Sequence, residues 1–125
     1  MKKYDKESIL NQYETSGKII YQATLNGDYK ANNREAKKLI KIFKIFEQDR
    51  ELAWACISKM LESENVVVRT KAAAYCLALN MNTDMAQEVL IQIRDNCEDG
   101  IFGLNAEMTL DVWNEQGYLD IYQKK

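Results

Sequence analysis

The feature that most constrains this chain is an internal repeat of 33 residues. When the sequence is shifted by that length, apolar residues fall on apolar residues along two successive segments. The pairs are Leu52 with Met85, Cys56 with Val89, Ile57 with Leu90, Met60 with Ile93, Val68 with Ile101, Ala73 with Ala106, Leu77 with Leu110 and Leu79 with Val112. Self-similarity at this period indicates stacked helical repeats, because one hairpin cannot bury its apolar face alone.

A further copy of the repeat lies upstream and is less regular. Shifting in the other direction places Leu79 on Phe46, whereas Leu77 falls on Lys44. Terminal repeats are expected to be atypical because one side of them faces water. We therefore expect an all-α fold, an α–α superhelix of about three stacked hairpins. The expected hairpins cover about residues 4–47, 50–79 and 83–116, within a single domain of residues 1–125.

Turn-forming residues separate segments of helical length, and within each segment apolar residues recur with helical periodicity. The expected helices are about 4–25, 32–47, 50–62, 66–79, 83–95 and 100–116, with turn signals that include Gly17 and Asn32-Asn33. The first helix is therefore open to a break near Gly17. Asn65 and Asp99 are candidate N-caps, because a side-chain oxygen there can accept from the free N–H groups of the first turn. We expect the second helix of each hairpin to line one shared surface.

The composition excludes several classes of site. Histidine is absent, which removes the commonest metal ligand and general base. The three cysteines, Cys56, Cys76 and Cys97, are about twenty residues apart, which argues for buried thiols rather than disulfides or a metal site. No apolar run approaches the length of a membrane span, and no signal peptide is evident, so we expect a cytoplasmic protein. Nucleotide-binding and hydrolase motifs are missing, and we expect no metal and no cofactor.

The stretch Glu64-Asn65-Val66-Val67-Val68-Arg69-Thr70-Lys71-Ala72-Ala73-Ala74 resembles the signature of a HEAT-like repeat. A later segment, from Ala106 through Trp113 to Leu119, fits the same pattern. Together they are similar to a family of short bacterial HEAT-like proteins catalogued only as a domain of unknown function. The resemblance implies a fold of stacked hairpins and leaves the activity open, because such stacks host scaffolds, lyase subunits and DNA glycosylases. It also suggests that Arg69 pairs with acidic or amide groups of a neighbouring turn and ties adjacent hairpins together, although its rigid fork could instead grip a carboxylate or phosphate.

Charge is distributed unevenly along the chain. Residues 1–50 carry a net charge of +4, and residues 81–125 carry −6. Four cations in the second expected helix recur with helical spacing and form either a basic stripe for an acidic partner or a solvated face: Arg34, Lys37, Lys41 and Lys44. Glu107 and Asp111 lie one helical turn apart and form either an acidic binding patch or a solvated face. The whole-chain pI near 5.2 weighs against nucleic-acid binding.

These features favour a non-catalytic module that recognises another protein. A concrete hypothesis is a cytoplasmic immunity or antitoxin-type protein that covers a basic toxin domain. One alternative is a nucleic-acid-binding HEAT-like protein that uses the basic stripe of the second helix. A further alternative is a small HEAT-type lyase or enzyme subunit, which requires a pocket holding an Asp, Glu, Tyr or Cys with a perturbed pKa.

Overall fold

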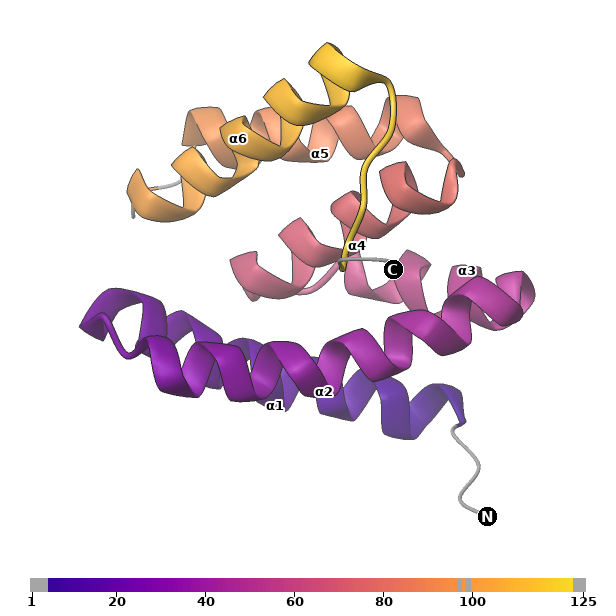
Figure 1. Cartoon of the computed structure of the whole chain (residues 1–125), viewed down its shortest axis with the longest axis horizontal. Helices are drawn as coiled ribbons and strands as arrows, with labels where there is room; N and C mark the ends of the chain where they lie inside the picture. Colours follow the sequence, from indigo (N-terminus) through magenta and orange to yellow (C-terminus); the bar gives the residue numbers. More distant parts are fainter. Residues whose placement is uncertain (1–4, 97, 99, 123–125) are drawn as a thin grey trace.

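The computed structural model describes residues 5–96, 98 and 100–122, and these residues form six α-helices and no strand. The helices are α1 (Lys6–Asn26), α2 (Tyr29–Gln48), α3 (Arg50–Met60), α4 (Val66–Leu79), α5 (Thr83–Asn96) and α6 (Gly100–Gln116). Successive helices pair into three hairpins, which stack in three layers (Figure 1). The predicted all-α fold of stacked helical hairpins is confirmed, and the helix bounds agree with the prediction to within a few residues.

Short polar side chains begin most of the helices, as their N-cap positions require. The Asn65 side chain accepts hydrogen bonds from the backbone N–H groups of Val67 and Val68, at 2.7 and 3.3 Å, so the predicted N-cap is confirmed. The other predicted cap, Asp99, lies outside the described residues. Three helices end at residues with a left-handed backbone: Gly27, with φ of 72°, closes α1, Asn80, with φ of 60°, closes α4, and Gly117, with φ of 78°, closes α6.

Gly17 does not break the first helix, contrary to the turn signal in the sequence. Helix α1 continues through it, and a Cβ at this position would lie 2.7 Å from Val68 Cγ2 and 3.2 Å from the Asn65 side chain. The glycine therefore allows α1 to approach the first turn of α4 closely. The Asn32-Asn33 signal is also wrong, because α2 already begins at Tyr29.

An aromatic cluster holds the first two hairpins together. The Tyr13 hydroxyl of α1 donates a hydrogen bond to the Tyr75 hydroxyl of α4 at 2.8 Å. From α2, the ring of Phe43 lies 4.7 Å from the Tyr75 ring, measured between centroids, and Phe46 packs on the same ring at 6.1 Å. All four side chains are buried, and burial raises the pKa of both tyrosines above its ordinary value.

Helix α4 is the centre of the stack. Its backbone lies close to those of α1, α3, α5 and α6, whereas α2 reaches it through the aromatic side chains described above. The second helices were expected to line one surface, and they do so only in part. Helix α6 lies along α4 as expected, but α1 occupies the place beside α4 that was expected for α2.

The segment after α6 returns across the middle layer to the first hairpin (Figure 1). It leaves the helix at Gly117, whose φ of 78° suits a glycine. At its end the Tyr122 hydroxyl donates a hydrogen bond to Glu47 of α2 at 2.6 Å, and the Lys44 ammonium lies 4.9 Å from the centroid of the Tyr122 ring. Residues 117–122, which we call the C-terminal strap, thus connect the third hairpin to the first.

Two of the cysteine predictions are confirmed. Cys56 and Cys76 are free, fully buried thiols, and burial raises the pKa of each to about 11. Cys97 lies outside the described residues. No helix within the described ranges is long and apolar enough to cross a membrane.

Candidate functional site

The outer face of α6 carries a row of exposed apolar side chains. Ile101, Leu104, Met108 and Val112 recur every three or four residues and therefore share one side of the helix. Their exposed fractions are 44, 52, 56 and 38%. We call these four residues the α6 stripe. Scattered exposed hydrophobic residues are normal on a protein surface, but four in register along one helix form a contiguous apolar strip.

The opposite side of α6 explains why the stripe faces outward. Phe102, Ala106 and Leu110 are buried against the rest of the stack. A Cβ at Gly103 would lie 3.1 Å from the backbone oxygen of Arg94, so α6 packs closely on α5 through this glycine. The internal repeat placed Ile101 at the position of Val68, which is buried. Ile101 is exposed instead, because no further hairpin of the described chain covers this side of α6.

Carboxylates border the stripe. Glu107, Asp111 and Glu115 lie one turn apart on α6 and are all exposed. The predicted acidic pair Glu107 and Asp111 therefore lies on the surface, beside exposed apolar groups that were not predicted as part of a site. On α5, Arg94 forms an ion pair with Asp95 at 2.8 Å; this pair raises the pKa of Arg94, and the charges of Glu107 and Asp111 add to the shift.

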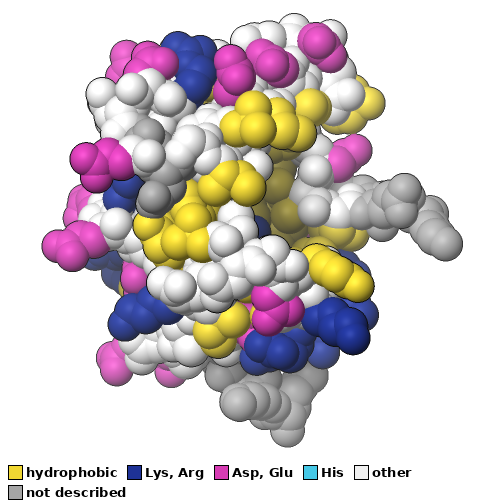
Figure 2. Space-filling view, turned by 90° about the vertical axis from the view of Figure 1, so that its left-hand side faces the viewer, with side chains coloured by type: hydrophobic (Ala, Val, Ile, Leu, Met, Phe, Trp, Pro, Cys, Tyr) yellow, Lys and Arg dark blue, Asp and Glu magenta, His cyan; other side chains and the backbone are white. Residues whose placement is uncertain are grey.

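The predicted basic residues of α2 are all exposed: Arg34, Lys37, Lys41 and Lys44. Two of them have partners within the chain, because Arg34 forms an ion pair with Glu35 at 3.1 Å and Lys44 lies over the Tyr122 ring. Lys37 and Lys41 form no ion pair within the described part of the chain. Figure 2 shows Lys and Arg gathered over the first hairpin, with hydrophobic side chains exposed between them and the mostly acidic upper edge.

A buried carboxylate underlies the basic face. Glu35 has a side chain that is 1% exposed, and it accepts hydrogen bonds from Ser16 at 2.8 Å, from Arg34 at 3.1 Å and from Lys38 at 3.2 Å. Burial pulls the pKa of the Glu35 carboxyl upward, but the three hydrogen bonds outweigh burial and hold the pKa below its ordinary value. Part of the positive charge on α2 therefore serves to neutralise this carboxylate.

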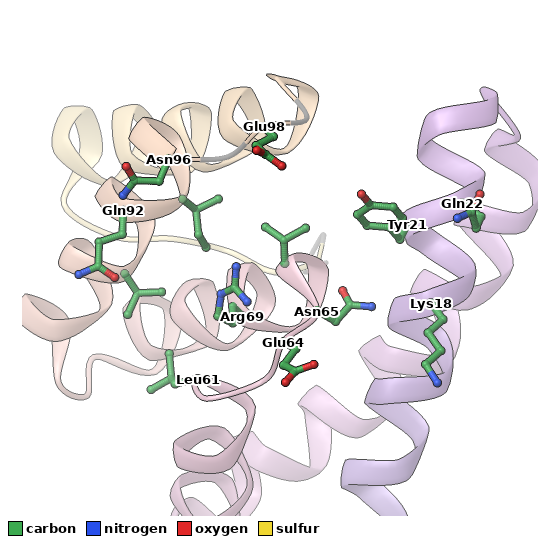
Figure 3. A pocket seen from close by; sticks show the side chains of 13 residues that line it. Lys18, Tyr21, Gln22, Leu61, Glu64, Asn65, Arg69, Gln92, Asn96 and Glu98 are labelled. Carbon is green, nitrogen blue, oxygen red and sulfur yellow. The ribbon is translucent and has the colours of Figure 1, made fainter.

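A groove of about 1010 Å³ lies between α1 and α5, with the start of α4 at its base. Figure 3 shows Lys18, Tyr21 and Gln22 of α1 on one side, and Gln92 and Asn96 of α5 on the other. Among the described residues, its charged lining consists of two cations and two carboxylates: Lys18, Arg69, Glu64 and Glu98. A groove with this mixed lining carries no strong preference for a ligand of either charge.

Arg69 stands at the centre of this groove (Figure 3). Its guanidinium donates a hydrogen bond to the backbone oxygen of Ser63 at 2.8 Å, which braces the loop between α3 and α4. The expected structural role of this arginine thus appears within its own hairpin rather than between hairpins. Glu107 and Asp111 are not among the residues that line the groove, so the predicted site residues do not form one site.

The tyrosines and cysteines whose pKa burial raises do not line the groove. Burial raises the pKa of Tyr13, Tyr75, Cys56 and Cys76, and all four are core residues. Among the described residues, no three metal-ligating side chains lie close enough to hold a metal ion. Comparison with protein-family models, curated proteins and solved structures finds no match to this chain.

Proposed function

We propose that this chain is a non-catalytic protein-binding module that docks its partner on the outer face of α6. The observation that carries the proposal is the α6 stripe with its border of carboxylates. Apolar patches rimmed by polar residues are typical of protein interfaces, where a few large buried side chains supply most of the binding energy. Stacked hairpins are well suited to this role because they present rigid, extended surfaces.

The charge of α6 indicates which kind of partner is complementary to it. The helix contains no Lys or Arg, and its carboxylates Glu107, Asp111 and Glu115 flank the stripe. Two copies of the chain that met through α6 would place carboxylates against carboxylates, which is unfavourable. A segment with apolar side chains flanked by Lys or Arg is complementary, and an amphipathic basic helix is its simplest form. We therefore assign the stripe to a basic partner protein.

A more specific form of this proposal is a cytoplasmic immunity or antitoxin-type protein of the HEAT-like group. The net charge of −6 over residues 81–125 supports it, because an acidic surface speeds association with a basic toxin domain. The stack of hairpins and the small residues of α4 support the HEAT-like grouping. Co-expression of this chain with a toxic partner tests the immunity hypothesis. Unchanged toxicity of the partner would overturn that hypothesis but not the proposal of protein binding.

The binding proposal is tested with a photo-crosslinking amino acid placed at Leu104, in the full chain expressed in its native host. The matched control carries the same group at Lys37, which is exposed on α2. We expect a crosslinked partner from position 104 and none from position 37. The purified partner should then bind the wild-type chain with an affinity that falls as salt rises. A crosslink from position 37 alone, or an affinity that is independent of salt, would contradict the proposal.

A further inference from the structure

A second cavity, of about 230 Å³, lies where α1, α4 and α6 meet. It shares no lining residue with the groove described above. Tyr21, which lines the groove, stacks on Phe102, which lines the cavity, with ring centroids 4.7 Å apart. The two spaces are therefore separate sites on either side of this ring pair.

Lys71 of α4 lines this cavity, and no described residue serves as its counter-ion. It is half-buried, and it forms no hydrogen bond or ion pair within the described part of the chain. No Asp or Glu among the described residues lines the cavity. Burial lowers the pKa of the Lys71 ammonium, because a cation withdrawn from water without a partner is costly. Buried charges in proteins are normally paired, so this amine lacks the anion that such an environment calls for.

Two further hydrogen-bond donors line the cavity with Lys71. The Thr24 hydroxyl of α1 accepts a hydrogen bond from Asn32 at 3.4 Å, and its own proton has no acceptor among the described residues. The Asn105 side-chain amide of α6 makes no hydrogen bond within these residues. The hydroxyls of Thr70 and Thr109 donate to backbone oxygens of their own helices and are not available as donors. Each of the three helices thus contributes one free donor group.

The rest of the lining is apolar, and it determines what kind of anion fits. Ile20, Val67, Ala74 and Phe102 supply hydrocarbon surface beside the donors. The volume is below the roughly 300 Å³ at which pockets begin to hold drug-sized ligands. A fully hydrated anion such as phosphate gains nothing from the apolar wall, whereas a short hydrocarbon chain or ring does.

We propose that this cavity binds a small organic monocarboxylate. Its carboxylate oxygens accept hydrogen bonds from the Lys71 ammonium, the Thr24 hydroxyl and the Asn105 amide. Its hydrocarbon part lies against Val67 and Phe102. Because the three donors come from α1, α4 and α6, the ligand bridges all three hairpins and stabilises the stack by mass action.

The test uses the full chain with lysines carrying ¹³C-methyl groups, titrated with sodium butyrate, sodium benzoate and sodium phosphate at constant ionic strength. We expect butyrate or benzoate to shift the Lys71 methyl resonance saturably, to raise the pKa of this amine and to raise the melting temperature. Lys71→Met should weaken the binding seen by thermal shift about tenfold or more, because a charge-assisted hydrogen bond is lost. Lys59→Met, at an exposed position of α3, is the matched control and should leave binding unchanged.

Several outcomes would overturn the proposal. They are the absence of saturation by either carboxylate, saturation by phosphate alone, and equal weakening in Lys59→Met. If Lys71→Met does not fold, Thr24→Val and Asn105→Leu test the other two donors by the same titration. Each of these variants should weaken carboxylate binding several-fold, and unchanged binding in both would also overturn the proposal.

Discussion

The outward faces of α2 and α6 lie on the first and last hairpins of the stack, and they differ in chemistry. Beyond its first residue, α2 exposes polar and basic side chains and no large apolar one. Helix α6 exposes four large apolar side chains and three carboxylates. The charges of α2 are partly engaged within the chain, by Glu35 and Tyr122, whereas the α6 stripe stays largely open to solvent. Charges that already have partners within the chain support a binding face less strongly than an uncovered apolar strip does.

The largest expected effect is a loss of partner affinity when the α6 stripe is disrupted. Leu104→Asp combined with Met108→Asp places charges in the centre of the stripe, where interface energy is concentrated. We expect partner affinity to fall at least about 100-fold, which corresponds to roughly 3 kcal/mol. Isothermal titration calorimetry with the purified partner, identified beforehand by crosslinking, measures this loss of affinity. Lys37→Glu combined with Lys41→Glu is the matched control on α2, and a comparable loss there would refute the assignment of the face.

The next prediction concerns stability and compares a buried carboxylate, Glu35, with an exposed one, Glu107. Glu35→Gln removes charge-assisted hydrogen bonds with Ser16, Arg34 and Lys38. We expect the free energy of unfolding to fall by about 2 kcal/mol, measured by urea denaturation. Glu107→Gln on the exposed face of α6 should change it by less than about 0.5 kcal/mol. Equal effects at the two positions would show that the Glu35 network adds nothing to stability.

The same carboxylate makes stability depend on pH in a defined direction. The pKa of Glu35 lies below its ordinary value of 4.5 in the folded chain, so its contribution is fully present above that value. The contribution is lost as pH falls from 4.5 through the lower, folded pKa. Unfolding curves recorded between neutral pH and pH 3 should therefore converge for the wild type and Glu35→Gln at the acidic end. A constant gap between the two proteins across this range would contradict the sign of the shift.

A smaller effect is expected where the C-terminal strap meets α2. Tyr122→Phe removes the hydrogen bond to Glu47 and leaves the ring under Lys44 in place. We expect a melting temperature slightly below that of the wild type, with a smaller drop than Glu35→Gln causes, because this bond lies partly in solvent. Tyr118→Phe, at an exposed position of the strap, is the control. If both substitutions change the melting temperature equally, the contact with Glu47 does not fasten the strap.

The smallest expected effect is weak DNA binding by the exposed lysines of α2. Lys37 and Lys41 are the two predicted cations of α2 that have neither an ion pair nor a ring contact among the described residues. If each of these two lysines contacts one DNA phosphate, duplex DNA should bind weakly. A plot of log affinity against log salt should then have a slope of about −2. Fluorescence anisotropy at several salt concentrations measures this slope. A submicromolar affinity at physiological salt, lost in Lys37→Glu plus Lys41→Glu, would restore the nucleic-acid hypothesis.

Local sequence signals predicted the helices well. The periodic placement of apolar residues and the cap at Asn65 depend on contacts within a few residues, which are visible in one dimension. The Gly17 turn signal was wrong because a glycine can serve either a turn or a close helix crossing. The contact with Val68, about fifty residues away, decides between these roles. The α6 stripe also has a signal in the sequence. Helix α6 is apolar on both sides, which is typical of a helix with a second contact surface.

The amino-acid sequence by itself determined the secondary structure, the pairing of helices into hairpins and the burial of Cys56 and Cys76. These properties follow from periodicity and short-range propensity. Only the tertiary structure decided that α1 lies beside α4, that residues 117–122 return to α2, and that Lys71 lines a cavity where no described residue is its counter-ion. The physical reason is that a helix's apolar face can be covered by several neighbours of similar pattern. Which neighbour covers it depends on the volumes and close approaches of residues far apart in the chain.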